Sequence, residues 1–119
     1  MTVKTKTKRA ALLQGSLDLL VLQSLKSGPR HGYSITRHLK QVSEDFLQIE
    51  EGSLYPALHR IERRGWIVAH WGTSESNRRA KFYQLTGEGR KQLRSETTAW
   101  QQMSLAINRV LNFQMDSAN

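Results

Sequence analysis

The sequence contains no cysteine, and no apolar run is longer than the four residues from Leu19 to Leu22. Without cysteine there is no disulfide framework, no thiolate zinc site, no iron–sulfur cluster and no cysteine nucleophile. Four apolar residues cannot cross a bilayer, and no apolar stretch typical of a secretory signal follows the first basic residues. We therefore expect one small cytoplasmic domain, with or without a flanking arm, and no membrane partner.

The motifs of common enzymes and metal sites are also missing. There is no Walker-type phosphate loop, no Gly-x-Gly-x-x-Gly, no Gly-x-Ser-x-Gly and no His-Glu-x-x-His. No carboxylate is spaced to complete a metal triad with His31 and His38. The acidic residues between positions 44 and 51 lack the alternating ligands and the glycine of a calcium loop. We expect no enzyme activity, no catalytic residue, no metal and no cofactor.

Positive charge is what the sequence has in excess, with 18 Lys and Arg against 10 Asp and Glu. Residues 1–9 hold four cations, and residues 52–94 hold nine cations against three acids. The segments 10–51 and 95–119 each carry one net negative charge. Because the cations gather in an arm and one central block, we expect a polyanionic partner, nucleic acid ahead of an anionic membrane. A basic surface that only keeps the protein soluble is the alternative.

Three segments place apolar residues at helical spacing, which predicts three short helices joined by brief turns. The first ends at Ser27-Gly28-Pro29, and the third begins at Gly52 or one residue earlier and ends at Gly65. Pro56 fits the third helix if it lies in the first turn, where no amide bond is lost. The apolar positions are Leu13, Leu17, Leu20 and Leu25 in the first segment, Ile35, Leu39, Val42 and Phe46 in the second, and Leu54, Leu58 and Ile61 in the third.

After Gly65 the apolar period changes to two, which predicts β-strands. A strand starting near Trp66 is followed by a polar connector at residues 72–77 and by a second strand at 81–85, anchored by Phe82 and Leu85. A hairpin of two strands is marginal alone, so it must pack on the helices. The predicted fold is mainly α with a small two-stranded antiparallel hairpin, a winged helix-turn-helix plus a long C-terminal helix.

Thr86 is a plausible N-cap for the last helix, whose apolar residues recur every seven positions. Heptad spacing is typical of a helix that packs along another helix. We interpret this helix as a dimerisation arm; the alternative is that it folds back over its own domain. The predicted interface residues are Leu93, Thr97, Trp100, Met103, Ile107, Val110 and Leu111.

The third helix carries the candidate DNA-binding face, opposite its core positions. That face combines hydroxyl, aromatic and guanidinium groups, which suit phosphate contacts and readout of bases in the major groove. A solvated basic face is the alternative. The predicted contacts on this helix are Ser53, Tyr55, Pro56, His59, Arg60 and Arg63.

The hairpin adds a basic wing. Its predicted contacts are Asn77, Arg78, Arg79 and Lys81, which could lie along the phosphate backbone or place arginine in the minor groove.

Three runs of residues together resemble the PadR family of bacterial transcriptional regulators. They are His31-Gly32-Tyr33, the run from Gly52 to Gly65 that contains Gly-Ser-Leu-Tyr-Pro-Ala-Leu, and the run from Lys81 to Gly89. The resemblance implies a winged-helix DNA-binding domain, a C-terminal dimerisation helix and, usually, repression relieved by a small molecule. With one helix after the hairpin, the chain is similar to the short form. We add Tyr33 to the predicted DNA contacts.

Trp100 matches the position of a tryptophan that, in multidrug-binding members of this family, lines a pocket at the dimer centre. The resemblance therefore implies an aromatic small-molecule effector bound at Trp100; plain interface packing is the alternative. Three positions depart from the family pattern. Glu50-Glu51 replace a more usual Ser-Pro, Ala80 replaces a residue that is often basic, and Trp66 is bulkier than the usual aliphatic residue.

We therefore expect a homodimeric, sequence-specific DNA-binding regulator, a repressor that binds a near-palindromic double-stranded operator. The alternatives are a non-specific architectural or RNA-binding protein, and an interaction protein whose last helix pairs with a different chain. The expected organisation is a basic arm at residues 1–10, a winged helix-turn-helix at 11–86, a dimerisation helix at 87–113 and a tail at 114–119.

Overall fold

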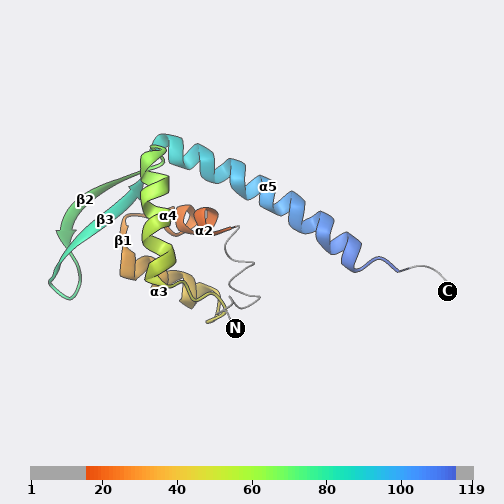
Figure 1. Ribbon diagram of the computed structural model, residues 1–119, viewed down its shortest axis with the longest axis horizontal. Coiled ribbons are helices and arrows are strands. Elements are labelled where there is room, and N and C mark those ends of the chain that lie inside the picture. The colour runs from red at the N-terminus through yellow and green to blue at the C-terminus, as the bar shows by residue number, and fades with distance from the viewer. Residues whose placement is uncertain (1–15, 115–119) are drawn as a thin grey trace, which may run out of the picture.

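Three helices pack against a small sheet, and a fourth helix projects away from them (Figure 1). In the computed structural model, which describes residues 16–114, no helix is long and apolar enough to cross a membrane. The expected arm at 1–10 and Leu13 of the first apolar pattern lie outside the described residues. The elements are α2 (Leu17–Ser24), β1 (Arg30–His31), α3 (Gly32–Val42), α4 (Glu51–Arg63), β2 (Ile67–Thr73), β3 (Arg79–Leu85) and α5 (Gly87–Leu111).

The predicted antiparallel hairpin is present as β2 and β3, but the sheet has three strands in the order β1-β3-β2, so the prediction of only two strands was wrong. In the additional strand, Arg30 pairs with Tyr83 and His31 with Phe82. Two residues are too few to give an alternating pattern, which is why the sequence did not reveal β1. The third strand ties the start of α3 directly to the hairpin.

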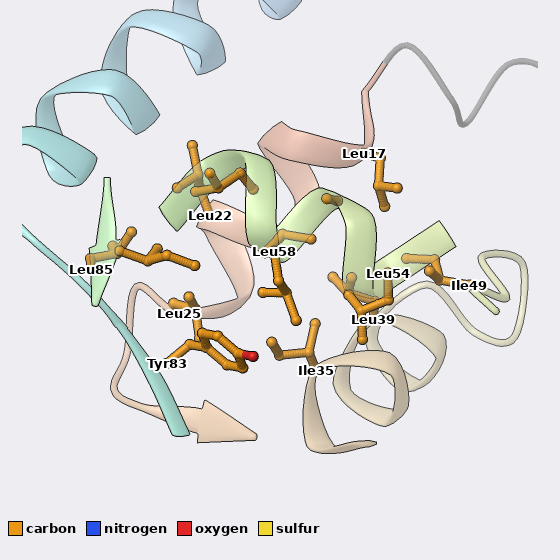
Figure 2. Packing of buried hydrophobic residues seen from close by; sticks show 14 of the residues in the cluster. Leu17, Leu22, Leu25, Ile35, Leu39, Ile49, Leu54, Leu58, Tyr83 and Leu85 are labelled. Carbon is orange, nitrogen blue, oxygen red and sulfur yellow. The ribbon is translucent and has the colours of Figure 1, made fainter. Parts of the chain in front are cut away.

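The core lies where α2, α3, α4 and one face of the sheet meet. In Figure 2, Leu54 and Leu58 of α4 point toward residues of the other helices. Tyr83 and Leu85 are the buried anchors of β3, at 2% and 5% exposed. The prediction that Phe82 shares this role with Leu85 was wrong, because alternate strand residues point to opposite faces and Phe82 lies on the outer one.

The end of α3 also differs from the prediction. Val42 and Phe46 were expected to continue its buried face, but they are 63% and 55% exposed. The helix stops at Val42, and Glu44 and Asp45 adopt left-handed backbone conformations with φ of 54° and 69°. This turn carries the chain out of helical register, and Ile49 is buried instead.

The start of α5 is fixed against the hairpin. The Thr86 hydroxyl accepts a hydrogen bond from the Gly89 amide at 2.9 Å, so the predicted N-cap is confirmed. The same hydroxyl donates to the Gly65 carbonyl at 2.7 Å, and Gly89 lies so close to the Trp66 carbonyl that a Cβ there would clash with it. From this anchor α5 packs against α2 and then projects beyond the other elements, ending at Leu111 rather than at residue 113 (Figure 1).

Candidate nucleic-acid interface

Helix α4 begins at Glu51, one of the two predicted positions. Glu50 is its N-cap residue without a side-chain capping bond, and Glu51 places a negative charge in the first turn. Pro56 is therefore the sixth residue of the helix and lies beyond the first turn. The prediction that proline costs no helical hydrogen bond at this position was wrong. Proline has no amide hydrogen, so the carbonyl of Gly52, an exposed residue, cannot receive its usual helical bond from position 56.

The exposed face of α4 agrees with the sequence prediction. Leu54, Ala57, Leu58 and Ile61 are fully buried. With successive residues about 100° apart, the positions opposite this core face are those of Pro56, His59 and Arg63, while Tyr55 and Arg60 lie on the two flanks. All six predicted contacts on α4 are exposed: Ser53, Tyr55, Pro56, His59, Arg60 and Arg63.

Arg60 is tied to helix α2. Its Nη2 atom lies 2.6 Å from Oδ1 of Asp18, and the two side chains are 45% and 27% exposed. A guanidinium has five N–H donors, so Arg60 can contact a further acceptor while it keeps this partner. Its charge toward DNA is nevertheless partly offset by the Asp18 carboxylate.

Tyr55 connects α4 to the start of α3, where Tyr33 lies at the surface. The Tyr55 phenol lies against Gly32, where a Cβ would clash with the ring and its hydroxyl. Tyr33 is 62% exposed, and the Arg37 guanidinium lies 5.6 Å from its ring centroid. The predicted contact Tyr33 is therefore at the surface beside a cation.

The wing is the free end of the β2–β3 hairpin. Its connection spans residues 74–78 rather than 72–77, because the strands extend to Thr73 and resume at Arg79. The Ser74 amide donates to the Arg78 carbonyl at 2.8 Å, and Asn77 adopts a left-handed conformation with φ of 62°. The predicted wing contacts lie together at this end, with Asn77, Arg78 and Arg79 exposed and Lys81 half-buried.

His31 joins the wing tip to α3. Its Nδ1 accepts a hydrogen bond from the Ser34 amide at 3.3 Å, so the neutral ring carries its proton on Nε2. That nitrogen lies 3.4 Å from the Glu75 carboxylate and donates to it. Hydrogen bonding to the backbone of Glu75 itself, followed by the bond from His31, lowers the pKa of the Glu75 carboxyl. His31 also meets Phe82 edge to face, with ring centroids 5.2 Å apart.

The predicted dimer residues on α5 divide into two groups. Leu93 is 5% exposed and belongs to the core of its own chain, and Thr97 is half-buried. The rest of the stripe is exposed: Trp100 at 51%, Met103 at 58%, Ile107 at 47%, Val110 at 75% and Leu111 at 73%.

Two contacts at this interface could not be predicted from the sequence: Asp18 lies beside Arg60, and Glu75 lies beside His31. Each pair joins residues more than 40 positions apart, and no local pattern signals it. The described residues contain no group of three or more His, Cys, Asp or Glu able to hold a metal.

Helix α3 is followed by α4, which has an exposed basic face, and then by the basic antiparallel wing. This arrangement defines the winged helix-turn-helix class of DNA-binding proteins. The model of the transcriptional regulator PadR-like family matches residues 21–95. The chain belongs to this family, whose members are DNA-binding regulators of transcription and not enzymes. This confirms the prediction that the chain belongs to the PadR family. It also confirms the predictions that follow from the family, namely that the protein binds DNA and is not an enzyme.

Solved structures of three bacterial regulators are similar to this protein over most of the chain. A PadR-like transcriptional regulator from Bacillus cereus is 26% identical, with a TM-score of 0.76 over 87% of this chain and 99% of that one. A PadR family regulator from Eggerthella lenta is 28% identical, with a TM-score of 0.74 over 88% and 89% of the two chains. A PadR family regulator from Clostridium difficile is 31% identical, with a TM-score of 0.69 over 82% and 100%.

Proposed function

We propose that this PadR-like protein acts as a homodimeric, sequence-specific repressor that a small aromatic effector releases from DNA. The observation that carries the proposal is the apolar stripe of α5, which runs at heptad spacing along a helix that projects from the domain (Figure 1). Its residues beyond Thr97 are between 47% and 75% exposed in the single chain. An apolar stripe of this kind favours pairing with a second helix of the same pattern, which supports a homodimer.

A two-fold dimer would present two copies of α4 to the same side of DNA. If these helices enter successive major grooves, they lie about 34 Å apart and select a near-palindromic site. Arg63 and His59 on the outer face of α4 are available for bases and phosphates there. A dimer bound across a promoter in this way would block transcription, and this is the repressor role that we propose.

The effector proposal rests on Trp100, which is 51% exposed and lies on the stripe. Paired indoles at a dimer centre would offer a flat apolar surface to a planar aromatic compound. Such a compound releases DNA only if it binds the DNA-free state more tightly than the bound state. Because Trp100 also lies on the proposed dimer stripe, Trp100→Ala is compared with the parent at a protein concentration at which sedimentation shows both to be dimers. Under that condition it is expected to bind DNA as the parent does and to lose release by any planar aromatic that releases the parent.

The direct test is selection of sites from a random duplex library by the full chain, followed by fluorescence anisotropy on the selected site and on a scrambled duplex. We expect the selected site to bind about a thousandfold more tightly or better, with an affinity that falls steeply as salt rises. Equal and weak binding to both duplexes would contradict the proposal and support a non-specific architectural protein.

A further inference from the structure

One face of the β2–β3 hairpin continues past the core into the wing. Ile67 and Tyr83 lie on this face and are 1% and 2% exposed, whereas Trp71, further along the same face, is 58% exposed. Lys81 is directly opposite Trp71, and Arg79 is two residue pairs closer to the tip, opposite Thr73 and on the same face. The free part of the wing thus carries an exposed indole between two cations.

The indole holds one of these cations in place. The Arg79 guanidinium lies 4.5 Å from the Trp71 ring centroid, the shortest of the four cation–π contacts given by the described residues. The ion pairs among residues 16–114 involve His31, Arg60 and Lys91, so Arg79, unlike Arg60, has no carboxylate partner there. Its charge is not offset, and its N–H edges remain available beside the indole.

We propose that Trp71 is a positioning residue, which orients the Arg79 guanidinium for insertion into the minor groove beside the bases that α4 contacts. The inference rests on the proposed sequence-specific function, because it requires a defined site with flanks. Narrow A·T-rich minor grooves have an enhanced negative potential that attracts arginine. A guanidinium already ordered on a strand loses less side-chain freedom on binding than one at a mobile tip. The wing therefore reads the width of the groove next to the recognised site.

The probe is a set of duplexes that share the site selected by the full chain and differ only in flanking pairs, A·T or G·C. The parent protein is expected to prefer the A·T flanks. Trp71→Ala should reduce this preference by about two- to five-fold, the size of an exposed cation–π contact. Trp71→Phe, which keeps an aromatic ring, should retain most of it. Val68→Ala, on the opposite face of the same strand and 48% exposed, is the matched control and should change nothing.

Arg79→Lys tests the inference at an exposed position, where folding is not at risk. Lysine keeps the charge but lacks the planar group that stacks on the indole. The slope of log K against log salt should therefore stay the same while the preference for A·T flanks falls as in Trp71→Ala.

Three results would overturn the inference. They are a parent without flank preference, a folded Trp71→Ala variant that keeps the preference, and an Arg79→Lys variant that keeps it. If Trp71→Ala lowers the melting temperature, Arg79→Lys decides. A selection that yields no site overturns the proposed function and this inference with it, whereas a selected site with flank-independent binding overturns the inference alone.

Discussion

At the scale of the residue, two arginines of α4 that look equivalent in the sequence have different surroundings. Arg60 is paired with Asp18 at 2.6 Å, whereas Arg63 is exposed and has no ion-pair partner among residues 16–114. The pair is partly exposed, so it adds about 1 kcal/mol or less to stability. Its larger effect is on the charge that each arginine offers to a phosphate.

We therefore predict that Arg63→Gln weakens DNA binding and its salt dependence more than Arg60→Gln does. The slope of log K against log salt is negative, and loss of one phosphate contact reduces its magnitude by about 0.9. Arg63→Gln should approach this value, while Arg60→Gln should change the slope less because Asp18 already offsets its charge. Anisotropy titrations across a salt series measure both slopes, and an equal change for the two variants would contradict this account.

Tyr83 gives a prediction about pH. Burial, followed by the nearby charge of Glu62 and by Tyr55, raises the pKa of the Tyr83 hydroxyl above its ordinary value of 10.0. As pH rises above 10, the unfolded state therefore loses this proton first, and the free energy of unfolding falls. Tyr83→Phe should reduce the fall measured by denaturant titration between about pH 8 and pH 11. Tyr33→Phe, at an exposed ring, is the control, and an undiminished fall in Tyr83→Phe would refute the assignment.

At the scale of the element, helices with a regular apolar pattern were predictable, and contacts between distant segments were not. The spacing of Leu54, Leu58 and Ile61 was sufficient to assign the buried face of α4, because helical periodicity is a local property. Strand β1 has two residues and therefore no period, and the bond from His31 to Glu75 spans 44 positions. Such features depend on tertiary packing, which a local pattern does not specify.

The apolar stripe of α5 makes a prediction at this scale. Ile107 lies on the heptad stripe and Leu105 lies off it, although they are similarly exposed at 47% and 52%. Ile107→Glu should raise the dimer dissociation constant by about a hundredfold or more, because an unpaired carboxylate would be buried at the interface. Leu105→Glu should leave it nearly unchanged.

Sedimentation velocity over a concentration series distinguishes the two variants, with circular dichroism to verify that both are folded. Parallel effects of both substitutions would mean that the heptad stripe is not the dimer contact. A parent protein that stays monomeric at micromolar concentration would contradict homodimerisation itself.

At the scale of the whole molecule, the recognition helix and the wing form one DNA-binding unit. Tyr55 packs α4 against α3, and His31 caps α3 while donating to Glu75 at the wing tip. Helix α5 leaves this unit from a start fixed by Thr86 (Figure 1). A dimer built through α5 would therefore hold two rigid units at a set separation, which is the property that a palindromic site requires.

The spacing of the two half-sites tests this central claim most directly. The measurement is the affinity of the full chain for its selected site and for the same site with about five base pairs inserted at the centre, half a turn of the duplex. We predict a loss of about a hundredfold or more, because only one half-site can then be contacted at a time. Equal affinity for the two duplexes would contradict the account.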